Sequence, residues 1–331
     1  MTEPRRQLLT IGALAVLLPA LAGCGSASND AEQTAVAAIA TLQAAAPPSN
    51  SPSASSKAQK PCPRDPTASL RPPRTLPRPG AMPPESFMAR IRRRGVLKVG
   101  VDQNTLLLAY RQPSTTHIDG FEVDLAHEIA RAIFGDPGKV DLTPVTTDKR
   151  FELVRSGNVD LLVDAATIKC ERLGLVDFST VYYNAGQRVL VPSDSTARSL
   201  ADLAGRRVCA TKTSTSLQFL QRYRPKIVPA VVPQRTDCLV ALQEGRVAAI
   251  SSDDAILLGL KAQDPNTKII GPRLEDEPYG IAIDKSHPEF VRFVNGVLER
   301  LRRDGTWKAL NHRWFGGVAP TPSPPRPHYR D

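Results

Sequence analysis

The chain has 331 residues, enough for one large core or two smaller lobes, and a formal net charge of +10. Residues 1–100 contain 13 Lys and Arg against 5 Asp and Glu, so most of the positive charge lies near the N-terminus. The remainder is close to neutral, which argues against a nucleic-acid-binding protein and leaves the basic leader to favour anionic lipid headgroups.

The N-terminus is typical of a bacterial export signal. Two arginines precede an apolar run at residues 8–22, which is too short to span a membrane but fits the core of a signal peptide. The run ends in Leu-Ala-Gly-Cys, which resembles a bacterial lipobox. This resemblance predicts a lipoprotein signal peptide at residues 1–23 and lipidation of Cys24, with ordinary cleavage as the alternative. The paired arginines leave Sec and twin-arginine export both open.

Residues 24–85 are predicted to form a tether. Ala, Ser and Pro dominate this stretch, and twelve prolines lie between Pro47 and Pro84. Such a composition buries too little apolar surface to offset the entropy of ordering, so we expect an extended, partly polyproline chain. The Pro-rich tail at residues 317–331 is predicted to be disordered for the same reason.

Between tether and tail, short apolar runs typical of strands alternate with amphipathic runs typical of helices, which predicts an α/β fold. Helices are predicted near residues 88–94, 122–134, 150–155, 217–223, 237–244, 254–263 and 290–301, with a last helix around Trp307 and Trp314. Strands are predicted near residues 96–101, 140–145, 159–163, 187–191, 207–210, 247–250, 268–270 and 281–283.

The segment at residues 160–183 indicates an anion site. A buried strand ends at Val163, and its carboxyl end is followed by Thr167 and, five residues later, by Arg172. Ligands of open α/β sheets bind beyond the carboxyl ends of strands, and a guanidinium can hold a carboxylate through two parallel hydrogen bonds. An arginine on a solvated turn is the alternative.

A second polar segment follows the strand predicted at residues 207–210. Residues 211–216 are rich in hydroxyl groups and precede a helix, whose free N–H groups attract anions. Simple helix capping is the alternative. Asp253 follows the strand at residues 247–250, where a helix cap is again the alternative to a ligand contact.

These segments, in this order, resemble the bacterial extracellular solute-binding proteins that take polar amino acids. The resemblance includes Gly-Phe-Glu-Val-Asp-Leu at residues 120–125 with its helix and extends over roughly residues 90–315. Within that family the chain is most similar to the actinobacterial glutamine-binding lipoproteins of ABC transporters.

The resemblance implies a two-lobed periplasmic-binding-protein fold (Venus flytrap, type II), with two hinge strands between the lobes. Lobe 1 would comprise residues 86–187 and 275–316, and lobe 2 residues 188–274. A weak internal repeat between residues 155–160 and 243–248 supports two lobes. A site between lobes can close by hinge rotation.

The resemblance also implies the ligand contacts. The ligand's carboxylate would meet Arg172, and its ammonium would meet Asp253. Relatives usually carry glycine where Thr213 stands. The full implied set, drawn from both lobes, is Asp102, Thr167, Arg172, Ser214, Thr215 and Asp253.

Side-chain specificity is assigned to a second group of residues. Acids near the pocket would favour an amide or amino side chain, whereas Lys169 or Arg150 would favour a carboxylate. Glutamine, asparagine, glutamate and aspartate therefore all remain candidate ligands. The candidate specificity residues are Asp164, Lys169, Arg150, Thr105 and Thr147.

The cysteines predict two disulfide bonds. With Cys24 lipidated, four cysteines remain, which allow three pairings. Cys209 ends a strand and Cys238 begins a helix of the same lobe, so we predict this pair together with Cys62–Cys170. Neither the cysteines nor the histidines have the spacing of metal ligands, and we expect neither a metal nor a cofactor.

The sequence thus predicts a receptor, lipid-anchored on the extracytoplasmic face of the cell membrane, which presents a polar amino acid to the permease subunits of an ABC transporter. One alternative is a lipoprotein that reports amino-acid availability to a transmembrane sensor protein. The other is an enzyme on the same fold, similar to cyclohexadienyl dehydratases. Such an enzyme needs a general acid in the cleft, and no carboxylate is assigned to that role, so we expect no enzymatic activity.

Overall fold

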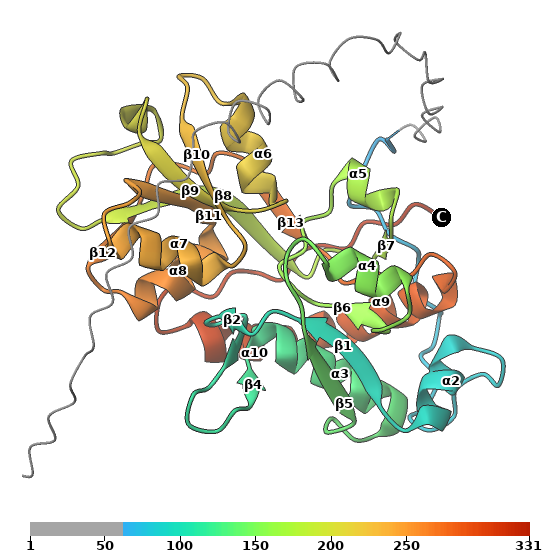
Figure 1. The fold of residues 1–331 in the computed structure, drawn as a ribbon. Helices are drawn as coiled ribbons and strands as arrows, with labels where there is room; N and C mark the ends of the chain where they lie inside the picture. Colours follow the sequence, from blue (N-terminus) through green and yellow to red (C-terminus); the bar gives the residue numbers. More distant parts are fainter. Residues whose placement is uncertain (1–61) are drawn as a thin grey trace, which may run out of the picture. The chain divides into compact units, whose positions relative to one another are not determined.

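The computed structural model describes residues 62–331 (Figure 1). They form two large mixed β-sheets with their helices and a small three-stranded sheet. The predicted signal peptide, the lipidation site Cys24 and the tether as far as residue 61 lie outside the described residues. Helix α2 (Phe87–Arg94) and the small sheet of β2 (Asn104–Thr105), β3 (Ala109–Arg111) and β4 (Ile118–Asp119) belong to lobe 1. Within residues 62–331, no helix combines the length and the apolarity needed to cross a bilayer.

The sheet of lobe 1 has the strand order β5–β1–β6–β14–β7. Strand β1 pairs in parallel with β5 and β6, whereas β14 runs antiparallel to β6 and β7. The strands are β1 (Leu97–Val101), β5 (Val140–Pro144), β6 (Leu161–Leu162), β7 (Asp177–Phe178) and β14 (Ala282–Ile283). The helices of this lobe are α3 (Phe121–Phe134), α4 (Arg150–Arg155), α5 (Cys170–Leu173), α9 (Pro288–Arg303) and α10 (Thr306–Phe315).

The sheet of lobe 2 has the strand order β10–β9–β11–β8–β12. Strand β9 pairs in parallel with β10 and β11, whereas β8 runs antiparallel to β11 and β12. The strands are β8 (Tyr183–Pro192), β9 (Arg207–Thr211), β10 (Val228–Val232), β11 (Ala249–Asp253) and β12 (Thr267–Ile270). The helices are η1 (Ala201–Leu203), α6 (Thr215–Arg222), α7 (Arg235–Gln243) and α8 (Asp254–Gln263).

Two strands connect the lobes. Strand β8 leaves lobe 1 and enters the sheet of lobe 2, and β13 (Asp276–Tyr279) returns antiparallel to its first half. The predicted hinge segments coincide with these two strands. The two-lobed α/β fold with two crossing strands is therefore confirmed.

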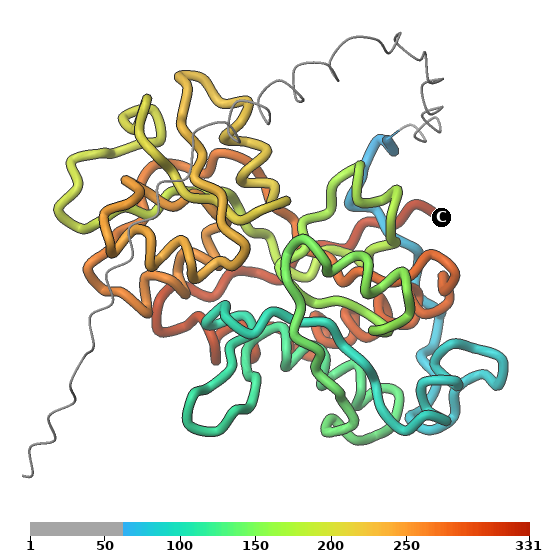
Figure 2. The backbone as a smooth tube through the Cα atoms, in the orientation of Figure 1, coloured from blue at the N-terminus to red at the C-terminus, as the bar shows by residue number. Residues whose placement is uncertain are grey.

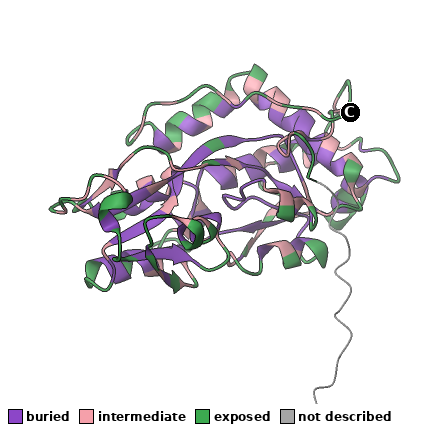
Figure 3. Cartoon of the chain, turned by 90° about the horizontal axis from the view of Figure 1, so that it is seen from above, coloured by how far each residue is buried: buried purple, intermediate pink, exposed green. Residues whose placement is uncertain are grey.

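The core of lobe 1 is built on apolar runs that are buried on both faces of the sheet. Figure 3 shows the strands mostly in the colour of buried residues. Phe121 begins α3 and packs edge-on against Trp307 and Phe315 of α10, with ring centroids 5.9 and 6.0 Å apart. A Cβ atom at Gly120, just before α3, would lie 2.1 Å from the carbonyl oxygen of Leu108, so only glycine permits this close approach.

The segment from Cys62 to residue 85 packs on lobe 1, and the C-terminal tail runs beside residues of both lobes (Figure 2). The predictions of a tether as far as residue 85 and of a disordered tail at residues 317–331 are therefore wrong for the described residues 62–85 and for the tail. Ser69 and Tyr329 form a parallel bridge, and the backbone N–H of Arg71 donates to Asp331 Oδ1 at 2.7 Å. Composition predicts how much apolar surface a segment buries by itself. Here two proline-rich segments form hydrogen bonds with each other, so their backbone polar groups find partners that composition alone does not reveal.

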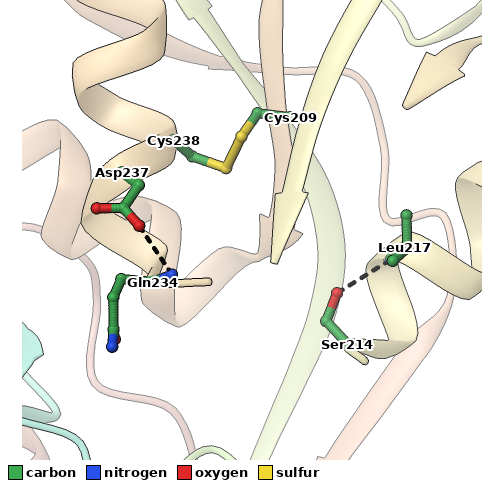
Figure 4. The surroundings of a disulfide bond; sticks show 6 residues. All are labelled: Cys209, Ser214, Leu217, Gln234, Asp237 and Cys238. Atoms are coloured by element: carbon green, nitrogen blue, oxygen red, sulfur yellow. Dashed lines mark hydrogen bonds between the residues drawn. A yellow bond between two sulfur atoms is a disulfide. The ribbon is translucent and has the colours of Figure 1, made fainter. Parts of the chain in front are cut away.

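Both predicted disulfides are confirmed. Cys209 of β9 is bonded to Cys238 of α7, with 5.6 Å between their Cα atoms (Figure 4). Cys62 is bonded to Cys170, the first residue of α5, with 5.5 Å between Cα atoms. The Cys62–Cys170 bond attaches the segment that begins at Cys62 to α5, and Cys170 precedes Arg172 by two residues.

Candidate functional site

A small cavity lies between the lobes, where β6 of lobe 1 and β9 and β11 of lobe 2 end. Its volume of about 20 Å³ holds roughly one water molecule. Six of the predicted site residues line it, from both lobes: Thr147, Arg150, Thr167, Ser214, Thr215 and Asp253. The other lining residues are Ala165, Thr211, Ser216, Arg235, Ser252 and Ile256.

Arg172 lies behind the wall of this cavity. Its Nη1 donates to the carbonyl oxygen of Thr167 at 2.9 Å, and its guanidinium lies 5.5 Å from the centroid of the Phe151 ring. Burial and the neighbouring charge of Arg150 lower the pKa of Arg172 to about 10, so it remains cationic at neutral pH. The structure thus places Arg172 next to Thr167, as predicted, but not on the surface of the cavity.

The first turn of α6 borders the cavity from lobe 2. Ser214 is the N-cap, and its Oγ accepts a hydrogen bond from the backbone N–H of Leu217 at 3.0 Å (Figure 4). Thr213 has a left-handed backbone with φ of 59°, which is the conformation that glycine favours. The N–H groups of the first helical turn have no intrahelical acceptors, so those of Thr215 and Ser216 are available at the cavity.

Asp253 lies at the end of β11, among other acidic groups. Its Oδ2 accepts a hydrogen bond from the hydroxyl of Tyr279 at 2.7 Å, and its side chain makes no cap hydrogen bond to α8. The simple capping alternative is therefore not observed. Burial, and next the charge of Glu277, raise the pKa of Asp253 to about 7, and burial also raises that of Glu277. A cation placed here would relieve both acids.

Asp102 and Asp164 are bound by an arginine that the sequence analysis did not single out. Arg235 of α7 forms ion pairs with both acids, at 2.8 Å from Nη1 to Asp164 Oδ1, and donates to Thr105 Oγ1 at 3.0 Å. Burial alone would lower the pKa of Arg235, but the charges of Asp164 and Asp102 raise it. An arginine at the start of an amphipathic helix has no signature in a single sequence, so nothing there pointed to this role.

The remaining predicted specificity residues divide into two groups. Arg150 is buried and pairs with Asp164, with 3.1 Å between Nη1 and Oδ2. Lys169 instead lies 3.7 Å from Glu275 in the hinge region and does not line the cavity, so the structure does not bring it into the site. Within the described range 62–331, no group of three or more His, Cys, Asp or Glu side chains is arranged to hold a metal ion.

The raised pKa of Asp253 predicts a pH dependence. An ammonium ligand requires ionised Asp253, so below pH 7 binding must release its proton. Affinity is expected to rise about tenfold between pH 6 and pH 8, and titrations in buffers of different ionisation enthalpy at pH 6 should detect a released proton. In the absence of ligand, the rise of the Asp253 pKa from 3.8 to about 7 makes the protein less stable as the pH rises through this pKa range, because the folded state holds a proton that the unfolded state has lost. Equal affinity at pH 6 and pH 8 would contradict this prediction.

Comparisons with known proteins agree with this geometry. The family model described as "Bacterial extracellular solute-binding proteins, family 3" matches residues 97–317. The ABC transporter glutamine-binding protein of Bacillus subtilis is 33% identical over 229 residues, covering 69% of this chain and 84% of that protein. The glutamine-binding protein of Geobacillus stearothermophilus is 34% identical over 211 residues, covering 63% and 80%.

Solved structures show the same fold. A mutant of an arginine-binding protein from T. maritima superposes with a TM-score of 0.64 at 30% identity, covering 69% of this chain and 99% of that chain. An ancestral arginine-binding protein bound to glutamine has a TM-score of 0.63 at 32% identity, covering 67% and 99%.

Proposed function

Because the chain belongs to the bacterial extracellular solute-binding proteins, family 3, we propose that it captures a polar amino acid between its lobes. The observation that carries this proposal is the arrangement of charge around the cavity. Cationic Arg172 lies behind the cavity wall in lobe 1, and the first turn of α6 borders the cavity from lobe 2. Asp253, at the end of β11, forms no ion pair within residues 62–331. These groups are complementary to the carboxylate and the ammonium of one zwitterion.

Such matching is needed because a buried charge without a partner is costly. We assign the ligand's carboxylate to Arg172, Thr167 and the backbone N–H groups of Thr215 and Ser216. The predicted N–H of Ser214 is excluded because it already donates to the carbonyl oxygen of Thr211 at 3.1 Å. We assign its ammonium to Asp253. A cavity of about 20 Å³ is too small for an amino acid, so binding requires the lobes to separate about β8 and β13.

The proposed ligands are glutamine, asparagine, glutamate and aspartate. The names of the Bacillus and Geobacillus relatives support the glutamine end of this class. Calorimetric titration of the protein with these four amino acids tests the proposal. Saturable binding of at least one is expected, and the absence of binding for all amino acids would refute the function.

We further propose that the protein is anchored on the extracytoplasmic face of the membrane through a lipid on Cys24, because the apolar run ends in Leu-Ala-Gly-Cys. A Cys24→Ala variant is expected to be released from the membrane or to remain unprocessed. Fractionation of cells followed by intact-mass measurement provides the readout. A variant that stays membrane-bound at the mature size would contradict lipidation.

The proposed partners are the permease subunits of an ABC transporter, with which solute-binding proteins of this family work. Reporting to a transmembrane sensor would use the same capture step and differ only in the membrane partner. Uptake of labelled amino acid in cells with and without the protein separates the two roles: transport requires uptake to fall when the protein is absent. Both roles assign binding rather than chemical conversion to the cleft, so no catalytic residue is proposed.

A further inference from the structure

Arg235 connects the two lobes at the candidate site. It belongs to α7 of lobe 2, yet its partners Asp102 and Asp164 follow strands of lobe 1. All three side chains are buried, at 6% exposure or less. We propose that Arg235 determines ligand specificity by occupying the place of a cationic side chain, so that the site excludes arginine, lysine and ornithine. This inference rests on the proposed function and specifies its ligand class.

The geometry of the two acids is that of a receptor for a cation. Asp102 follows β1 and Asp164 follows β6, so both lie at the carboxyl edge of the lobe 1 sheet, where ligands of such sheets bind. Asp164 accepts from Arg235 through Oδ1 at 2.8 Å and from Arg150 through Oδ2 at 3.1 Å. Thr105 Oγ1 also donates to Asp102 Oδ2, at 3.0 Å.

The charges in this cluster balance. Asp102 and Asp164 face Arg150 and Arg235, and both ion-pair partners of Asp164 among the described residues are guanidinium groups. Glu122 lies behind Ala165, accepts from its backbone N–H at 2.6 Å and does not line the cavity. A ligand that brought a third cation would find both aspartates already paired with arginines. It would have to displace Arg235 or remain unpaired in a buried site.

The same arrangement favours a side chain that ends in an oxygen. Arg235 lines the cavity, and its Nη1 holds three acceptors, whereas Nη2 makes only a 3.5 Å contact with the carbonyl oxygen of Asp164. Nε of Arg150 is buried and has no hydrogen-bond partner among the described residues. These donors suit the carbonyl oxygen of an amide or a carboxylate.

The local backbone fixes the position of Arg235. The N–H of Gln234, just before α7, donates to Asp237 Oδ2 at 3.0 Å, and the Cys209–Cys238 bond ties the first turn of α7 to β9 (Figure 4). Arg235 therefore extends from an anchored helix start. This rigidity is what a side chain that imitates part of a ligand requires.

The test compares the wild type with Arg235→Ala and Arg235→Gln by calorimetry, using glutamine, asparagine, glutamate, aspartate, arginine, lysine, ornithine and citrulline. Citrulline is the matched probe, since it is a neutral analogue of arginine with nearly the same shape. Wild type is expected to bind none of the three cationic amino acids measurably. At least one variant should gain roughly 30-fold or more in affinity for arginine or lysine, because the incoming cation pairs two buried aspartates. Citrulline should gain far less.

Lys212→Ala provides a control. Lys212 also joins lobe 2 to lobe 1, at 3.2 Å from Asp148, but it is exposed and lies outside the cavity, so its removal should leave the preference among ligands unchanged. Arg235→Gln retains amide donors and serves if the alanine variant does not fold.

The outcomes separate this inference from the proposed function. If wild type binds glutamine and neither Arg235 variant gains a cationic ligand, the inference is wrong and the function stands. Wild-type binding of arginine or lysine as tight as that of glutamine also overturns the inference. If wild type binds no amino acid, the proposed function fails, and this inference fails with it.

Discussion

An Arg172→Ala variant is expected to bind every amino-acid ligand about 30-fold or more weakly than wild type. The ligand's carboxylate would lose its only proposed side-chain cation, and truncating one partner of a buried charge pair costs about 2–5 kcal/mol. Since about 1.4 kcal/mol corresponds to a factor of ten, the lower end of this range already gives roughly 30-fold. The measurement is calorimetric titration with glutamine, asparagine, glutamate and aspartate.

The pattern across ligands distinguishes this role from specificity. Asp253→Ala should produce a similar loss for every ligand, because the ammonium is common to all of them, whereas changes at Asp102 or Asp164 should reorder the ligands. Arg222→Ala is a matched control, since Arg222 pairs with Glu275 at the exposed surface. Arg172→Ala and Asp253→Ala proteins that bind as tightly as wild type would contradict this assignment of the site.

Removing the Cys209–Cys238 bond is expected to lower the free energy of unfolding by about 3–4 kcal/mol. The bond closes a loop with a sequence separation of 29 residues, and the cost follows from the chain entropy that such a loop restores to the unfolded state. Both cysteines are fully or almost fully buried, so the double Cys209→Ala, Cys238→Ala variant avoids placing an unpaired hydroxyl in the core. Urea denaturation, monitored with a fluorescent probe attached to lobe 2, provides the measurement.

As a control, the free energy of unfolding of the wild type is measured both with its disulfides oxidised and after their reduction. Reduction should move the wild type toward the stability of the variant and leave the variant itself less affected, since only Cys62–Cys170 remains to be reduced. A change in unfolding free energy below about 0.5 kcal/mol would contradict the prediction. So would free thiols at both positions in a peptide map of the untreated protein.

The strands and helices of both cores were predictable because their residues are apolar with a regular period. Strand β1 and helix α3 lie within one or two residues of their predicted positions. Strand β10, which contains a proline, was not predicted. Proline cannot donate to a β-ladder, so it argues against a strand except at an edge, and β10 is the edge strand of its sheet.

The site was predictable only in part, because a local sequence motif does not show contacts made with distant parts of the chain. Arg172 and Asp253 were identified because each follows a strand end and matches a family motif. Arg235 was missed because its role depends on the opposite lobe, which a sequence window around residue 235 does not contain. Lys169 flanks Thr167 in the sequence and was predicted to face either the pocket or solvent. Its side chain extends toward Glu275, which is more than a hundred residues away in sequence.

The central claim is that one amino-acid zwitterion is held between Arg172 and Asp253. A crystal structure of the protein with its tightest-binding amino acid tests this most directly. We expect the ligand between the lobes, with its carboxylate bonded to the Arg172 guanidinium and the N–H groups of the first turn of α6, and its ammonium bonded to Asp253. A ligand bound outside the cleft, or one whose ammonium makes no contact with Asp253, would contradict the claim.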